Sequence, residues 1–210
     1  SEEASQTCAS VDDSTDTEDD KVKCWGDNAD GRLGLGDSSA RGDAGSEMGD
    51  NLPVVDLGSN LTAKQVSAGG GQTCAIVDDS TDTEDDKVKC WGENTNGRLG
   101  LGDTNARGDA GSEMGDSLPF VDLGVGRTAK KISTATNTCA ILDNDETVCW
   151  GRGAEAQNGN GSTASIGDAG GEMGASLVKV ELGTSRYATE IYSTANHHCV
   201  KLDNGDVKCW

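Results

Sequence analysis

The chain contains 210 residues, of which 37 are acidic and 17 basic, and its formal net charge is -20. A surface of this sign repels nucleic-acid phosphates and anionic lipid headgroups, so we expect no nucleic-acid partner. Only 33% of the residues are hydrophobic. Because no apolar run approaches the roughly 18 residues that cross a bilayer, we also expect no membrane insertion.

The first predicted element is a cysteine hairpin that recurs four times along the chain and ends each time in a Cys-Trp dipeptide. These hairpins contain all eight cysteines and all four tryptophans of the protein. The two cysteines are 16 residues apart in the first two copies and 10 apart in the last two. Because this difference is even, both spacings leave the cysteines on one face of a two-stranded hairpin.

The last hairpin indicates the register. A three-residue loop at 203–205, ending in a glycine that adopts a left-handed conformation, places Cys199 opposite Cys209. This register favours a cross-strand disulfide, and the repetition extends it to every copy. The predicted pairs are Cys8 with Cys24, Cys74 with Cys90, Cys139 with Cys149, and Cys199 with Cys209.

A metal site is the alternative use of these cysteines. The sequence has no C-x-x-C motif, and its only histidines are the adjacent His197 and His198, so disulfides are favoured over metal binding. Structural disulfides persist in oxidising compartments. We therefore expect an extracellular or cell-surface protein.

Each of the first three hairpins is followed by a glycine-rich block of 24 residues, at 26–49, 92–115 and 151–174. Turn-forming residues dominate these blocks, so we expect loops there. Two short apolar runs follow, for example at 52–57 and 63–68. Together with the hairpin, every period then holds four short strands, the pattern of a propeller blade.

Two motifs carry a family resemblance. They are Cys-Trp-Gly-x-Asn at 24–28 and Gly-Arg-Leu-Gly-Leu-Gly-Asp at 31–37, repeated at 90–94 and 97–103. They resemble the RCC1 repeat of the regulator-of-chromosome-condensation family, and in particular its secreted, cysteine-bearing branch. The resemblance covers the chain from about Gln6 to Trp210 and implies a β-propeller, commonly of about seven blades. That family's exchange activity on a small GTPase is not carried over, because its partner-binding residues lie outside the repeat signature.

The period divides the chain into a first disulfide hairpin at 1–25 and three repeats at 26–91, 92–150 and 151–210. We therefore expect an all-β fold of RCC1-like blades, about three and a half in number, each with four short antiparallel strands. About seven blades would need roughly twice this length. The expected partner is the rest of a longer parent chain or a second copy, either closing a ring or stacking head to tail as an open array.

Acidic residues crowd the predicted tips of the two long hairpins. Calcium takes six to eight oxygen ligands, although the spacing here does not match an EF-hand loop. A solvated acidic loop is the favoured interpretation, and calcium is the only cofactor that the sequence suggests. The candidate ligands are Asp12, Asp13, Asp16, Asp19, Asp78, Asp79, Asp82 and Asp85.

Two further motifs concern the surface. N-glycosylation sequons begin at Asn60 and Asn160, both in predicted loops, so glycans are expected there if a eukaryotic cell secretes the chain. Arg-Gly-Asp, the integrin-recognition tripeptide, occurs at 41–43 and 107–109, but Ile166 replaces the arginine in the third copy. Glycine-aspartate is thus the repeated element, and adhesion through the tripeptide is disfavoured.

The sequence offers few combinations of residues that could carry out catalysis. A serine or cysteine nucleophile needs a neighbouring base, and the two histidines precede Cys199 in a repeated structural position. The sequence contains no phosphate loop or dinucleotide fingerprint, so we expect no enzyme. The favoured function is an extracellular structural or interaction repeat protein, such as a subunit of a fibre or surface assembly. The alternative is a discrete propeller that binds a protein or carbohydrate ligand.

Overall fold

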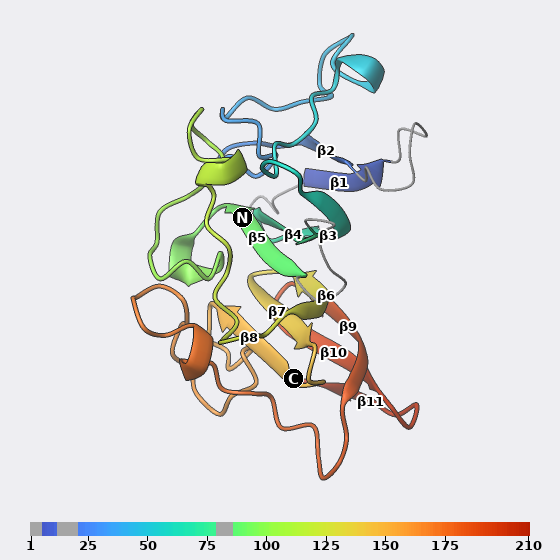
Figure 1. The fold of residues 1–210 in the computed structure, drawn as a ribbon, viewed down its shortest axis with the longest axis vertical. Coiled ribbons are helices and arrows are strands. Elements are labelled where there is room, and N and C mark those ends of the chain that lie inside the picture. Colours follow the sequence, from blue (N-terminus) through green and yellow to red (C-terminus); the bar gives the residue numbers. More distant parts are fainter. Residues whose placement is uncertain (1–5, 12–20, 79–85) are drawn as a thin grey trace.

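The computed structural model describes residues 6–11, 21–78 and 86–210. These residues form an all-β fold, as predicted, with four small antiparallel sheets that follow one another in chain order (Figure 1). The strands are β1 (Gln6–Val11), β2 (Lys21–Gly26), β3 (Thr62–Gly69), β4 (Gln72–Asp78), β5 (Lys87–Gly92), β6 (Ala129–Thr134), β7 (Asn137–Leu142), β8 (Thr147–Gly151), β9 (Ala188–Thr194), β10 (His197–Leu202) and β11 (Val207–Cys209). Short 3-10 turns lie at η1 (Gly49–Asn51), η2 (Thr95–Gly97), η3 (Gly115–Ser117) and η4 (Gly174–Ser176). Among the described residues, no helix has the length and apolar character needed to pass through a bilayer.

Each sheet contains one disulfide hairpin. The structure pairs Cys199 with Cys209 across β10 and β11, in the register expected from the loop at 203–205. In that loop the Leu202 amide donates to the Asp206 carbonyl at 2.8 Å, and Gly205 has a φ of 88°. The other disulfides join Cys8 to Cys24, Cys74 to Cys90, and Cys139 to Cys149.

The fourth strand of the blade is shorter than the sequence suggests. The segment 118–123 runs beside β5, but one main-chain hydrogen bond joins them, from the Val121 amide to the Val88 carbonyl at 2.8 Å. Pro119 has no N–H to donate, but the third copy has Val178 at this position and forms only an isolated bridge, between Val148 and Lys179. The blade therefore has three regular strands and one extended rim segment. Equivalent bonds of 2.8 Å join Val55 to Val22 and Val180 to Thr147.

The rim segment explains the path of the chain between sheets. After the β4–β5 hairpin, the glycine-rich block leaves the sheet, and the chain returns to the same sheet at 118–123 before continuing to β6. Each block is thus a long loop that begins and ends on one sheet. Because the block projects from its own sheet, it is available to contact the next one.

The hydrophobic core lies between the sheets. Three clusters of buried residues are present among the described residues, and each draws side chains from two neighbouring sheets. The cluster between the second and third sheets includes Ile76, Ile132 and Trp150. The central strands β4 and β7 are consequently buried along almost their whole length, whereas β1 and β10 are partly exposed.

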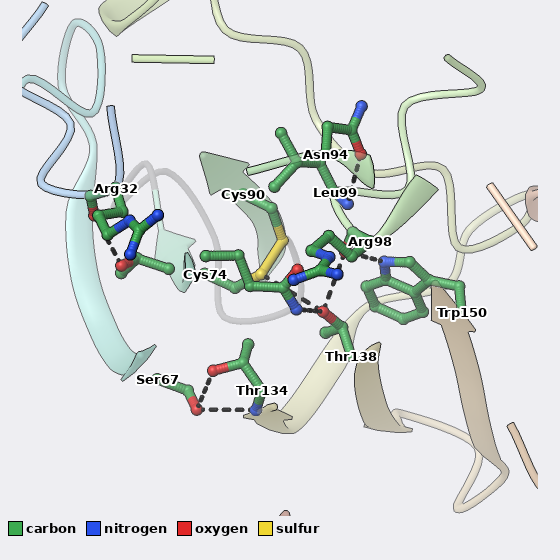
Figure 2. Close-up of a disulfide and its surroundings, with 12 residues drawn as sticks. Arg32, Ser67, Cys74, Cys90, Asn94, Arg98, Leu99, Thr134, Thr138 and Trp150 are labelled. Atoms are coloured by element: carbon green, nitrogen blue, oxygen red, sulfur yellow. Dashed lines mark hydrogen bonds between the residues drawn. A yellow bond between two sulfur atoms is a disulfide. The ribbon is translucent and has the colours of Figure 1, made fainter. Parts of the chain in front are cut away.

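The innermost strands β3, β6 and β9 lie side by side across successive sheets (Figure 1). The Gln65 side chain of β3 bonds both backbone groups of Ile132 in β6, as a neighbouring strand would. Its Nε2 donates to the Ile132 carbonyl at 2.9 Å, and its Oε1 accepts the Ile132 amide at 3.2 Å. The Ser67 hydroxyl accepts the Thr134 amide at 3.0 Å (Figure 2). These bonds set the spacing of adjacent blades at their inner edge.

Replacing Cys139 and Cys149 together by alanine should lower the free energy of unfolding by more than the matched change at Cys199 and Cys209. Both disulfides close loops of the same length, with cysteines 10 residues apart, for which loop entropy contributes about 3 kcal/mol. Only the first pair is fully buried, so its removal also leaves a cavity. Urea denaturation of both double variants measures the difference, and equal losses would contradict a packing role for the buried disulfide.

Candidate functional site

A tight turn at 31–34 opens the first glycine-rich block, and Asn28 shapes it. The Asn28 side chain is fully buried, its Oδ1 accepts the Leu33 amide at 2.9 Å, and its Nδ2 donates to the Asp37 carbonyl at 2.7 Å. In the second block, Asn94 Oδ1 accepts the Leu99 amide at 3.0 Å (Figure 2), and its Nδ2 donates to the Asp103 carbonyl at 2.9 Å. An apolar residue here would leave buried backbone groups unpaired. This requirement accounts for the asparagine of the Cys-Trp-Gly-x-Asn motif.

The tryptophan of the next hairpin packs on this turn. The Trp150 Nε1 lies 2.7 Å from the position that a Cβ would occupy on Gly100, whose φ is 70°. The same Nε1 donates to the Arg98 carbonyl at 3.1 Å (Figure 2). The contact and the backbone conformation both require glycine. The packing recurs for Trp91 on Gly34, at 2.7 Å, and for Trp210 on Gly159, at 2.8 Å.

We call the contact between a glycine turn and the tryptophan of the next hairpin a joint. A methionine and a second glycine complete it. The Met173 Cε lies 2.9 Å from the same Cβ position on Gly100, and the Gly167 carbonyl accepts the Gly102 amide at 3.0 Å. The preceding joint has the same arrangement, with the same two distances. We call the tryptophan, the glycine that accepts the bond and the methionine the receiving surface of a blade. Its members are Trp91, Gly108 and Met114 in the second blade, and Trp150, Gly167 and Met173 in the third.

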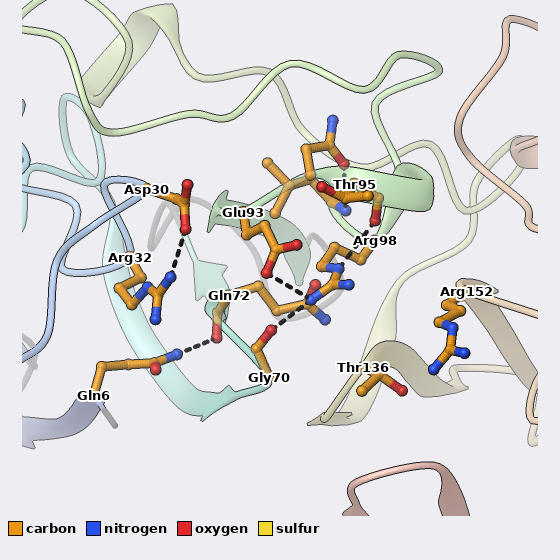
Figure 3. A network of polar contacts seen from close by, with 12 residues as sticks. Gln6, Asp30, Arg32, Gly70, Gln72, Glu93, Thr95, Arg98, Thr136 and Arg152 are labelled. Atoms are coloured by element: carbon orange, nitrogen blue, oxygen red, sulfur yellow. Dashed lines mark hydrogen bonds and ion pairs between the residues drawn. The ribbon is translucent and has the colours of Figure 1, made fainter. Parts of the chain in front are cut away.

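The arginine of each turn is buried, and its guanidinium group forms an ion pair with a nearby carboxylate. Arg32 and Arg98 are only 5% and 6% exposed. Arg98 donates to the Gly70 carbonyl and pairs with Glu93 at 3.1 Å, and Arg32 pairs with Asp30 (Figure 3). Burial lowers the pKa of Arg98, and Glu93 opposes this effect. Because arginine stays protonated in proteins, both turns carry a compensated charge.

A histidine replaces threonine in the last joint. His198 occupies the position of Thr138 and is fully buried, with Nδ1 2.6 Å from the Ser193 hydroxyl and Nε2 2.6 Å from Asn137 Oδ1. The Asn137 amide donates to Asn158 Oδ1 at 2.9 Å, so its own oxygen is the acceptor for histidine. The network therefore assigns the proton to Nε2 of a neutral imidazole. Burial lowers the pKa of His198 to about 4.

Comparison with known proteins identifies the repeat. The family described as Regulator of chromosome condensation (RCC1) repeat matches residues 19–76. The ultraviolet-B receptor UVR8 of Arabidopsis thaliana is 30% identical over 144 residues, which cover 67% of this chain and 27% of UVR8. The mitochondrial RCC1 domain-containing protein RUG3 of the same plant is 28% identical over 147 residues, which cover 70% of this chain and 29% of RUG3.

The fold comparison agrees. Human WBSCR16 superposes with a TM-score of 0.63 at 15% identity, over 90% of this chain and 42% of that one. Yeast RCC1 (Prp20), solved with Kap60, gives 0.61 at 14% identity, over 90% and 39%. The chain is an RCC1-repeat protein. Its four disulfides fit the cysteine-bearing branch, and it spans less than a third of the length of both curated relatives.

The arginines of the two Arg-Gly-Asp tripeptides form ion pairs within their own glycine-rich blocks. Arg41 pairs with Asp37 at 2.6 Å and Arg107 with Asp103 at 2.7 Å. Both arginine side chains are only 18% exposed. An integrin-like partner would have to break these pairs, which agrees with the interpretation that the tripeptide is incidental.

Sequence reasoning missed the glutamate that closes each RCC1 block. Glu47 Oε2 accepts the Gly42 amide at 2.8 Å and the Ala44 amide at 3.2 Å. These bonds, the Gly42 amide first, hold the pKa of Glu47 below its usual value. Glu113 and Glu172 repeat the arrangement. The available signal was the glutamate's constant position in all three blocks.

The calcium hypothesis falls largely outside the described residues. Asp78 is described, and its carboxylate pairs with Lys64 at 2.8 Å. Over 6–11, 21–78 and 86–210, no group of three or more His, Cys, Asp or Glu residues is arranged to hold a metal ion. The remaining candidates, Asp12, Asp13, Asp16, Asp19, Asp79, Asp82 and Asp85, lie outside these ranges.

The two sequons differ in their surroundings. Asn60 is exposed in a turn with a φ of 60°, immediately before β3. Asn160 is half-buried and its Oδ1 accepts the Ser162 amide at 3.0 Å. A transferase therefore reaches Asn60 more readily than Asn160.

Substituting Gly100 by alanine should destabilise the protein more than substituting Gly126. The two glycines have nearly equal φ angles, 70° and 68°, but only Gly100 faces Trp150, because nothing lies within 4 Å of a Cβ at Gly126. The control change carries the backbone cost of about 1 to 2 kcal/mol. Gly100→Ala adds overpacking worth about 1 to 3 kcal/mol. Equal unfolding free energies in urea would show that the indole contact does not constrain this position.

The stability of the last joint should depend on pH through His198. Its pKa is about 4 when folded, against 6.5 for the ordinary side chain, so the unfolded chain takes up the proton first as pH falls. About 3 kcal/mol of stability should therefore be present above about pH 6.5 and disappear as pH falls towards about 4. His198→Thr restores the residue of the other repeats and should remove this component. Parallel stability curves for the two proteins between these pH values would refute the assignment.

Proposed function

We propose that this chain is an extracellular structural repeat protein, a disulfide-stapled scaffold of RCC1 blades that stack through one recurring joint. The observation that supports this best is the joint itself. Trp91, Trp150 and Trp210 each pack on a glycine of the preceding repeat, at 2.7 to 2.8 Å from its Cβ position. The glycine contact recurs at all three joints, and the indole N–H also donates to a carbonyl at Trp150 and Trp210, whereas Trp91 Nε1 has no hydrogen-bond partner among the described residues. A contact that recurs in this way suits a protein whose role is to extend or complete an array.

The disulfides support the proposed location. Cys24, Cys74, Cys90, Cys139 and Cys149 have no exposed surface, so these sulfurs serve the core and are poorly placed for exchange. Disulfides of this kind are typical of proteins that mature in an oxidising compartment. Glycans at Asn60 would fit the same location.

We propose no enzymatic activity. All eight cysteines are bonded in disulfides, and His198 has hydrogen-bond partners on both ring nitrogens. A catalytic base needs a lone pair directed at a substrate. The strongly negative charge likewise argues against nucleic-acid partners.

A discrete binding module is the second candidate, and one groove favours it. A hollow of about 340 Å³ at the rim of the second sheet is lined by Lys87, Asp116 and Phe120, among other residues. Phe120 is 41% exposed, and the Lys87 and Lys89 ammonium groups lie 5.4 and 4.8 Å from the centroid of its ring. Val54 and Lys179 take the place of Phe120 in the neighbouring repeats. This divergence is what a ligand site on one blade requires.

Electron microscopy and mass measurement of native protein, isolated without reductant, should show assemblies with a periodic blade spacing. A thiol assay of the same material should find no free thiols. Uniform closed particles would reject the open array, and free thiols under denaturing conditions would reject the oxidising location. Phe120→Ala separates the two candidates, since it should leave the assemblies unchanged. Loss of a ligand from an otherwise intact Phe120→Ala particle would instead support the binding module.

A further inference from the structure

We propose that the groove beside Phe120 binds an extended peptide of a partner protein, through a carboxylate and an apolar side chain two residues along. We call this hollow, which lies at the rim of the second sheet, the rim groove. Lys87 is the residue that meets the carboxylate. The inference goes beyond the scaffold proposal and deepens the second candidate function, on which it rests only in taking the rim groove as a binding surface.

The rim groove holds a positive charge that the chain leaves without a carboxylate. Each arginine of the protein forms an ion pair. Lys87 does not, since no carboxylate of the described residues lies within ion-pair distance of it, and its ammonium group faces the Phe120 ring at 5.4 Å from the centroid. In a chain of net charge -20, such an ammonium group at the edge of a groove complements an anionic ligand.

The other charged groups of the rim groove already have partners. Asp116 Oδ1 accepts the Ser59 amide and Oδ2 accepts the Ser59 hydroxyl, both at 2.7 Å. The Lys89 ammonium group donates to two backbone carbonyls at 2.8 Å and lies 4.8 Å from the centroid of the Phe120 ring. The charges of Lys89 and Asp116 also offset each other. These groups therefore shape the groove, and Lys87 remains for the ligand.

The remaining lining is apolar and favours a side chain over a sugar. Leu61, Val77 and Leu118 line the rim groove beside Phe120. A sugar needs hydrogen-bond partners for its many hydroxyls, whereas the polar groups of Ser59 and Asp116 are bonded to each other. The methylenes of a glutamate suit the apolar wall, and its carboxylate can reach Lys87 at the edge.

Phe120 also lines a second hollow, which indicates how far the ligand extends. This hollow has a volume of about 230 Å³ and is lined by Leu101 and Met173, among other residues. The exposed ring therefore stands between two hollows. Side chains on the same face of an extended peptide are two residues and about 7 Å apart, so one can enter the rim groove while the next enters the second hollow.

The packing of the blades does not require this combination of residues. The glycines and tryptophans of the joints recur, as a structural contact demands. Two lysines and a phenylalanine come together at the rim of the second blade alone among the three repeats. Their places are taken by Lys21, Lys23 and Val54 in the first blade and by Glu146, Val148 and Lys179 in the third.

The test uses the full chain and its single phenylalanine. Because Phe120 is the only one, isotopic labelling of this amino acid gives one ring to follow by NMR. The probe is the peptide acetyl-Ser-Glu-Ser-Leu-Ser-amide, and its control carries glutamine in place of glutamate. The glutamate peptide should shift the ring signals saturably at millimolar concentration. The glutamine peptide should bind about tenfold more weakly, because it loses a hydrogen bond to a charged group.

Two charge variants locate the contact. Lys87→Gln should bind both peptides with the same low affinity. Lys201→Gln removes an exposed lysine from β10, in the fourth sheet, and should bind the glutamate peptide as the unmodified chain does. Both variants change the net charge equally, so a loss of affinity in both would assign the effect to overall charge and overturn the role of Lys87.

The other outcomes separate this inference from the proposed functions. Equal affinity of the unmodified chain for the two peptides, or no shift with either, would overturn it. Stronger binding of sodium glucuronate would overturn the choice of a peptide and keep the binding module. A ring shift that appears on concentrating the chain alone, and is lost in Lys87→Gln, would replace the partner protein by a second copy. Free thiols or uniform closed particles count against the scaffold and leave the rim groove unaffected.

Discussion

In each of the three glycine-rich blocks, a glycine turn packs against the tryptophan of the hairpin that follows the block. The contacts join Gly34 to Trp91, Gly100 to Trp150 and Gly159 to Trp210. Trp150 fills the space over Gly100 and bonds the Arg98 carbonyl, so a single side chain supplies both apolar area and a satisfied polar group. Only 33% of the residues are hydrophobic, and a large aromatic ring at each joint concentrates the apolar burial where two blades meet. The disulfide beside it brings the two strands of the hairpin into register, and the ring follows the second cysteine directly.

Side chains that bond the backbone stabilise the long glycine-rich loops. Asn28 and Glu47 bond backbone amides at the two ends of the first block, where no helix or sheet does so. Lys89 is 2% exposed and donates at 2.8 Å to the carbonyls of Leu57 and Gly115, which ties the rims of two blades. Burial lowers the pKa of Lys89. Buried polar groups with complete partners specify one arrangement, and they compensate for the short strands.

Several of these features could be predicted from residues alone. The hairpin register followed from the even difference in cysteine spacing, and the loop at 203–205 lies as expected. The fourth strand was overestimated, because apolar alternation at 118–123 indicates burial of one face and does not establish a hydrogen-bonded ladder. The third copy, with Val178 in place of the proline, likewise forms only an isolated bridge. Asn28 and Glu47 recur at equivalent positions in the repeats, so their importance could be inferred from the sequence. Their backbone partners depend on the geometry of the loops, which the periodicity of the sequence does not encode.

The sequence by itself determined the all-β class, the four disulfides and the family, because these depend on local spacing and on motifs that recur in register. Only the tertiary structure decided which surfaces of the repeats are covered. Trp25 and Trp91 follow the same residues in the chain, yet one is partly exposed and the other fully buried. The reason is physical: burial of a joint belongs to two blades at once, so it depends on the neighbour and cannot be read from either repeat alone.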